Sequence, residues 1–296
     1  GGLDGAIIIP VSMSMRVFCG RFHPSLEDAF VARVVELSAQ KKSFAIVAPS
    51  RRMAERLQRL LALERGLGLL GVRFHTFYSL ALEVVESSGG LPADLVADGL
   101  FHDKIIDGVL AARPRAQVST RGLASAYRSS IRDLVDCGLE PAAYREDFEG
   151  LLKEGAQKSR LLDVLEVQER YLRRLEEIGV LPPSGLTRLA AEAVEKGSCR
   201  VLERCGELLY YGFYDLTGAQ ADFFSAVAKA HPVSVFFPYV KGHPAYLFAE
   251  RFYEQKLHAG GARPAHLGAV APKAAALAFI SASGAEDEAW AAAKEI

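Results

Sequence analysis

The segment from Gly20 to Glu27 follows the first expected strand, where nucleotide-binding α/β proteins place a phosphate-binding loop. Such a loop reads G-x-x-x-x-G-K-[ST]; its glycine amides and lysine hold the phosphates, and its hydroxyl holds magnesium. Aligned from Gly20 and Arg21, this chain fills the last three positions of the pattern with Ser25, Leu26 and Glu27. A carboxylate ~4 Å from a phosphate costs about 4 kcal/mol at an effective dielectric of ~20. The residues therefore predict a degenerate phosphate loop.

A different enzyme class shares the opening of this turn. Nucleotidylyltransferases carry G-R-F-x-P-x-H-x-G-H, and residues 20–24 match its first part. The two histidines of that motif stabilise the reacting phosphates, and their positions hold Leu26 and Ala29 in this sequence. Nucleotidyl transfer is therefore an alternative that lacks its phosphate-contacting histidines.

A group of arginines follows the second expected strand, on a helix predicted over residues 51–64. At 100° per residue, Arg52, Arg56 and Arg59 fall within one narrow sector, and Arg51 begins the helix. Such a stripe suits contacts with the phosphates of a nucleic acid. A charged face that only meets solvent is the alternative explanation.

The segment after the third expected strand combines polar and aromatic side chains, His75, Thr76, Phe77 and Tyr78. The carboxyl ends of parallel strands are where α/β sheets bind ligands. Exposed aromatic rings at such a place could stack on unpaired bases. A helix cap followed by core aromatic residues would give the same pattern.

The end of the fourth expected strand is where a P-loop ATPase carries Asp-Glu, the first for magnesium and the second for the attacking water. Aligned on Phe213, Asp215 and Gln220, those two positions hold Tyr211 and Gly212. We interpret Asp215 as the cap of the helix that follows. The second nucleotide motif is therefore degenerate as well.

The elements that must position these residues form an α/β pattern with an interruption. Strands alternate with helices over residues 15–90 and again over 197–272, which predicts a parallel sheet covered on both faces. Residues 91–196 carry helical periodicity and lack β-branched runs, so we expect an all-helical insertion. Residues 273–296 read as the beginning of a second α/β domain, and residues 1–14 as a leader outside the fold.

Composition narrows the class of protein. The chain has 296 residues, half of them hydrophobic, so it can bury a substantial core. Thirty-five Lys and Arg against 36 Asp and Glu exclude a polycation, so any nucleic-acid binding must come from a local patch. Four cysteines without C-x-x-C spacing argue against a zinc module and a disulfide framework, and favour a reducing, cytoplasmic setting. We find no membrane-spanning or signal segment in the sequence.

Taken in order, four segments resemble superfamily 1 helicases of the UvrD/RecB type, namely residues 45–57, 72–80, 209–220 and 279–296. The helical block lies where such proteins insert their 1B subdomain. Within this group, the sequence resembles the AddB-type subunit of AddAB helicase-nucleases, a family with decayed ATPase motifs joined to a C-terminal PD-(D/E)XK nuclease.

The resemblance implies a P-loop-like domain 1A for the α/β core, a 1B-like insertion and the start of a 2A-like domain. It also implies that single-stranded DNA crosses the 1A face near Arg51, Arg52 and the turn 75–78, with a RecB/AddA-like motor subunit as partner. We therefore expect a catalytically silent, DNA-binding fragment of a double-strand-break repair nuclease subunit, without a cofactor or metal of its own. The alternatives are an active superfamily 1 ATPase or helicase, which would use ATP and magnesium, and a non-catalytic scaffold.

Overall fold

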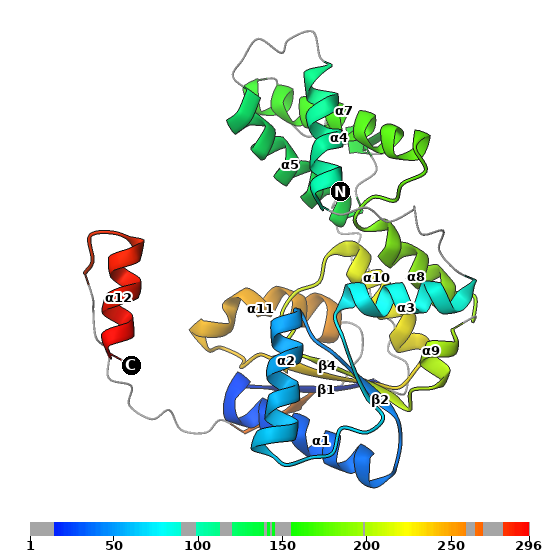
Figure 1. Cartoon of the computed structure of the whole chain (residues 1–296), viewed down its shortest axis with the longest axis vertical. Helices are drawn as coiled ribbons and strands as arrows, with labels where there is room; N and C mark the ends of the chain where they lie inside the picture. The colour runs from blue at the N-terminus through cyan, green and yellow to red at the C-terminus, as the bar shows by residue number, and fades with distance from the viewer. Residues whose placement is uncertain are drawn as a thin grey trace.

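A computed structural model gives the architecture of the chain (Figure 1). It describes residues 15–89, 99–112, 120–138, 141–142, 144–145, 155–197, 199–258, 264–268 and 281–295. The expected leader and the first residues of the expected second domain lie outside these ranges. No helix in the described part of the chain combines the length and the apolar character needed to cross a bilayer.

The described strands form one parallel sheet in the order β3-β2-β4-β5-β1-β6. The strands are β1 (Met15–Gly20), β2 (Phe44–Val47), β3 (Val72–His75), β4 (Glu207–Tyr211), β5 (Val233–Pro238) and the short β6 (Ala265–His266). The predicted α/β class with a parallel sheet is therefore confirmed. The two halves of the sequence pattern interleave, because β4 lies between β2 and β5.

Both faces of the sheet are buried, as the near-continuous apolar strands require. In β4, Leu208 and Tyr210 pack into one hydrophobic cluster, whereas Leu209 and Tyr211 pack into the cluster on the other face. The second face is covered by α1 (Glu27–Ala39) and α2 (Arg51–Arg59), which continues as the π-helical turn η2 (Leu60–Glu64). Ser50 caps α2 as its position suggests, its hydroxyl accepting the Met53 N–H at 3.2 Å.

The first face is covered by helices from both halves of the core: α3 (Phe77–Ser88), α8 (Gly185–Glu195), α9 (Arg200–Glu203), α10 (Gly218–Ala230) and α11 (Leu247–Phe252). The short turns η4 (Pro244–Tyr246) and η5 (Tyr253–His258) flank α11. Helix α8 falls within the expected insertion of residues 91–196, yet Leu186, Ala190 and Val194 are buried in the core cluster. It packs against α3 and α10, so this part of the helical block belongs to the α/β layer.

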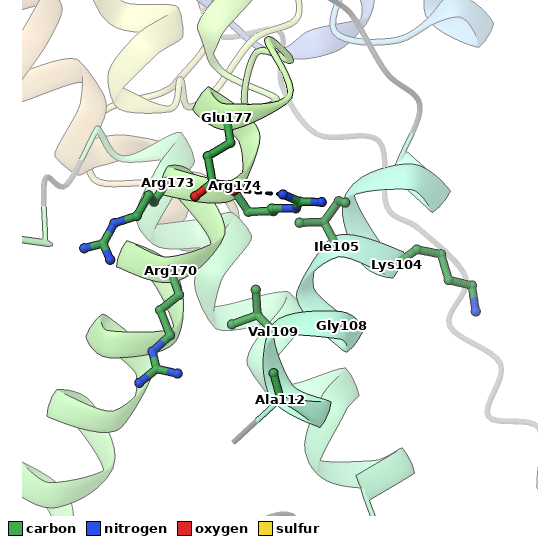
Figure 2. A pocket seen from close by; sticks show the side chains of 9 residues that line it. All are labelled: Lys104, Ile105, Gly108, Val109, Ala112, Arg170, Arg173, Arg174 and Glu177. Atoms are coloured by element: carbon green, nitrogen blue, oxygen red, sulfur yellow. Dashed lines mark hydrogen bonds and ion pairs between the residues drawn. The ribbon is translucent and has the colours of Figure 1, made fainter. Parts of the chain in front are cut away.

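Three other helices form a separate bundle at one end of the molecule (Figure 1). These are α4 (Gly99–Ala111), α5 (Thr120–Asp136) and α7 (Ala156–Glu177). Their shared core contains Ile106, Ile131 and Tyr171. Helices α4 and α7 run side by side, and an open groove lies along their contact (Figure 2). Helix α12 (Ala285–Glu295) is exposed along most of its length.

A buried ion pair fixes the amino end of β4. Glu207 is 5% exposed and accepts hydrogen bonds from the Arg33 guanidinium and, at 2.5 Å, from the Ser234 hydroxyl. The carboxylate raises the pKa of Arg33 through this hydrogen bond, so the arginine stays charged inside the protein. These contacts join α1 to β4 and β5 near the amino ends of the two strands.

Candidate nucleic-acid interface

The degenerate phosphate loop is closed by the protein's own side chains. After β1 the chain enters a π-helical turn, η1 (Phe22–Leu26), in which the Leu26 N–H bonds to the Arg21 carbonyl at 3.0 Å. A side chain at Gly20 would lie 3.1 Å from Leu267, so the residues after β6 cover this glycine closely. Leu26, at the lysine position of the phosphate-loop pattern, is fully buried. The Ser25 hydroxyl bonds to the Gly268 carbonyl at 3.5 Å.

The two positions at the end of β4 that would serve metal and water are also buried in the core. Tyr211 packs in an aromatic cluster, with ring centroids 5.5 Å from Phe22, 4.7 Å from Phe30 and 6.2 Å from Phe236. Gly212 has a φ of 80°, and a side chain there would meet the Phe22 ring at 3.1 Å. Aromatic rings therefore occupy the space between the turn after β1 and the end of β4.

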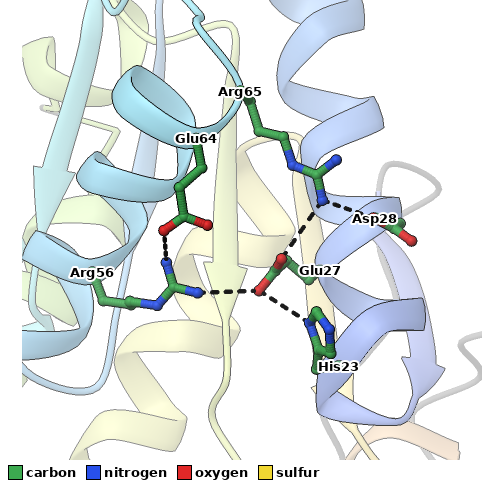
Figure 3. A network of polar contacts seen from close by, with 6 residues as sticks. All are labelled: His23, Glu27, Asp28, Arg56, Glu64 and Arg65. Carbon is green, nitrogen blue, oxygen red and sulfur yellow. Dashed lines mark hydrogen bonds and ion pairs between the residues drawn. The ribbon is translucent and has the colours of Figure 1, made fainter.

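Glu27 lies at the centre of a charge network that joins the start of α1 to α2 (Figure 3). Its carboxylate lies 3.7 Å from Arg56, 3.6 Å from Arg65 and 3.6 Å from the His23 ring. Arg56 also binds Glu64 at 2.6 Å, and Arg65 binds Asp28 at 3.0 Å. The cations beside the loop are thus neutralised by carboxylates of the chain itself.

The crevice between β2 and β4 has the geometry of a ligand site. The helix after β2 covers one face of the sheet and the helix after β4 covers the other, which opens a crevice at the carboxyl ends of the strands. A cleft of about 670 Å³ lies there. Its lining includes Pro49 after β2, Tyr78 after β3, Tyr214 and Asp215 after β4, and Cys137 from the end of α5.

Of the four residues predicted after β3, one offers an exposed ring. Tyr78 is 51% exposed, whereas Phe77 is 5% exposed and packs edge-on against Phe213 at 4.9 Å. Phe77 is thus a core residue and cannot stack on a base. Thr76 caps α3, accepting the Ser79 N–H at 3.2 Å.

His75, the remaining member of that set, is buried at the end of β3. Its Nε2 atom lies 3.4 Å from the Glu83 carboxylate, without a hydrogen bond. Burial lowers the pKa of His75 below its usual value, more than the nearby Glu83 raises it. The imidazole is therefore neutral at pH 7 and adds no positive charge to the cleft.

The loop after β4 differs from the sequence-based interpretation at its helix cap. Thr217, not Asp215, caps α10. Its hydroxyl accepts the Gln220 N–H at 3.4 Å, and the Gln220 side-chain oxygen accepts the Thr217 N–H at 3.2 Å. This capping box needs a residue directly before the helix, and Asp215 comes two residues too early. The Asp215 carboxylate instead accepts the Leu216 N–H at 2.8 Å and remains exposed.

The predicted arginine stripe divides into paired and unpaired cations. Arg51 has a 91% exposed side chain and bonds to Glu55 one turn away at 3.1 Å. Arg56 lies between the two carboxylates described above, one of them the largely buried Glu27, so its charge is already balanced and it attracts a phosphate less than Arg52 does. Arg52 and Arg59 are exposed and have no acidic partner among the described residues. Because α2 begins two residues after Pro49, Arg51 and Arg52 lie at the cleft end of the helix, with Arg59 ~10 Å further along its axis.

Sequence reasoning missed two aromatic residues beside the cleft. Tyr214 is 52% exposed and Phe248, at the start of α11, is 60% exposed; their rings meet edge-on with centroids 5.1 Å apart. All residues of β4 are buried, so the signal that could have indicated Tyr214 is its position just beyond the end of that strand. Phe248 had no such signal, because only the fold brings α11 to this edge.

Comparisons with known proteins leave the family open. No family model matches the chain, and no curated protein matches it either. The geometry of the cleft therefore carries the functional argument.

Proposed function

We propose that this chain is the helicase-like, single-stranded-DNA-binding portion of a double-strand-break repair nuclease subunit of the AddB type, with an inactive nucleotide site. DNA binds in the cleft between β2 and β4 and across the start of α2. A RecB/AddA-like motor subunit would supply the ATP-driven movement, and the cytoplasm is the expected compartment. The proposal rests on the sequence resemblance and on the two observations that follow.

The single observation that carries DNA binding is the composition of the cleft edge. Two half-exposed tyrosines, Tyr78 and Tyr214, reach the cleft from the ends of different strands. Stacking on an aromatic ring contributes ~1–3 kcal/mol per base and needs unpaired bases. Arg51 and Arg52 stand at the adjoining helix start, where they can contact the phosphates of the same strand.

The filled loop supports the absence of ATP turnover. Glu27 takes the place of the magnesium-binding hydroxyl, Leu26 that of the lysine, and the Tyr211 ring that of the acidic residue after β4. A nucleotide would have to displace Phe22 and Leu267 from their packing positions. The same features weigh against nucleotidyl transfer, which also needs triphosphate beside Gly20.

The proposal is tested with a fluorescent 20-nucleotide oligonucleotide titrated with the full chain. We expect single-stranded DNA to bind more tightly than duplex, and Tyr78→Ala combined with Tyr214→Ala to weaken binding by at least ~30-fold, from ~1 kcal/mol or more per ring. Trp290→Ala is the matched control, an exposed aromatic residue on α12 that lies outside the cleft. Equal binding by the double variant and the wild type would contradict the assigned cleft.

Two alternatives give different results in the same preparation. An active ATPase requires that ATP with magnesium raise the melting temperature, because a ligand bound only to the folded state stabilises it. A pure scaffold requires that a motor subunit bind the chain while the oligonucleotide does not. We expect neither.

A further inference from the structure

The groove between α4 and α7 is a surface that the DNA-binding proposal does not use. Its volume is about 340 Å³, it lies between two helices of the bundle (Figure 2), and none of its lining residues lines the cleft between β2 and β4. The floor is apolar, formed by Ile105 and Val109 of α4, both partly exposed. The next face of α4 already packs Ile106 and Leu110 into the bundle core. Ile105 and Val109 pack against the edge of this same core and stay partly exposed, so the apolar face of α4 extends beyond the bundle into the groove.

The rim of the groove is basic on both sides. Lys104 extends outward from the α4 side, while Arg170, Arg173 and Arg174 stand on the α7 side together with one carboxylate, Glu177 (Figure 2). Lys104 has no acidic partner in the described ranges. Each arginine is held by a carboxylate of its own helix, Arg170 by Glu166 at 2.7 Å and Arg174 by Glu177 at 2.8 Å. Exposed pairs of this kind are weak, so an incoming carboxylate can share the guanidinium.

We propose that this groove docks an amphipathic helix of a partner protein, with an apolar stripe bordered by Asp or Glu. The apolar stripe would cover Ile105 and Val109, and the acidic borders would meet Lys104 on one side and the α7 arginines on the other. This is helix-in-groove recognition, read by side chains one turn apart. Nucleic acid fits less well, because its phosphates would lie on aliphatic side chains that cannot replace their water.

Gly108 makes the surface accessible to a helix. It lies on the groove between Ile105 and Val109, and a side chain built there would meet nothing within 4 Å. No packing inside the described chain therefore requires a glycine in the middle of α4. A glycine at this point lets the backbone of a second helix approach closely.

The test uses two 20-residue helical peptides with leucines at i, i+3, i+4 and i+7, one with flanking glutamates and one with flanking lysines. Fluorescence anisotropy with the full chain should give at least tenfold tighter binding for the glutamate peptide. Gly108→Gln should weaken that binding at least tenfold while leaving the thermal unfolding midpoint the same or higher, because glutamine favours a helix over glycine. Ala111→Gln is the matched control, since Ala111 is exposed on α4 but does not line the groove.

Equal binding of the two peptides, or full binding by Gly108→Gln, would overturn the proposal. So would displacement of the glutamate peptide by single-stranded DNA, which would assign the groove to nucleic acid. Two further results would assign it to this chain itself: a shift of Trp290 emission in Gly108→Gln, pointing to α12, or a dimer in sedimentation that the variant dissociates. The DNA-binding assay with the tyrosine variants is independent of all five outcomes.

Discussion

The division of the arginine stripe gives a sharp prediction about salt dependence. Arg52 and Arg56 lie one turn apart on α2 and are both exposed, but carboxylates of the chain neutralise only Arg56. Each phosphate contact on single-stranded DNA contributes a slope of about −0.7 to log K against log salt. Arg52→Ala should therefore flatten the slope by ~0.7. When salt is lowered tenfold, the affinity of this variant should rise about five times less than that of the wild type. Arg56→Ala should leave the slope unchanged.

The measurement is a series of oligonucleotide titrations from 0.05 to 0.5 M potassium chloride, with the wild type and both variants. Circular dichroism confirms that each variant folds, which matters because Arg56 helps to hold Glu27. A third variant, Glu64→Gln, removes one of the two acids on Arg56 and should strengthen binding slightly. The reasoning fails if Arg56→Ala flattens the slope as much as Arg52→Ala, or if neither variant changes it.

Three further predictions concern stability and the exposed thiol. Glu207→Gln leaves Arg33 buried without its main counter-charge, so the free energy of unfolding in urea should fall by about 3 kcal/mol or more; a loss below ~1 kcal/mol would show that Glu36 suffices. Burial lowers the pKa of His75 and of His231, so the unfolded state binds more protons just below pH ~6.5 and stability should drop as the pH falls through that value; replacing both with Gln should flatten this profile. Cys137 is the exposed cysteine of the four, and the partial burial of its thiol together with nearby acids raises its pKa. Its alkylation should therefore need a more alkaline pH than an ordinary thiol, and should slow when single-stranded DNA fills the cleft that it lines.

Local patterns predicted the sheet because each strand carries its own signal. The apolar run that ends at Pro49 and the apolar segment of β4 indicate fully buried strands, and Ser50 indicates the start of α2. Sequence patterns could not show that α8 packs on the sheet and not in the helical bundle. Its alternation of apolar and polar residues fits any buried face, and only the return of the chain to the sheet decides that Leu186 joins the core.

The candidate site includes some of the residues singled out from the sequence, and the placements that differ from expectation share one cause. Residue types place aromatic rings and cations near a strand end, but they do not say which way each side chain points. Phe77 and Tyr78 are neighbours of similar type, and the helix start turns one inward and the other outward. Arg56 and Arg52 share a helix face, yet Glu27 reaches Arg56 from another helix. Such pairings across segments depend on tertiary structure.

The strand order also constrains how the polypeptide can assemble. The central strand β4 joins β2 across more than 150 intervening residues, and β5 joins β1 across an even longer stretch. The ribosome must therefore synthesise the chain as far as β5 before the middle of the sheet can form, and until then the apolar faces of β1 and β2 and their unpaired backbone groups stay exposed. Pairing over such separations is slow, so the nascent chain should depend on chaperones, and a truncation before residue 238 should not fold.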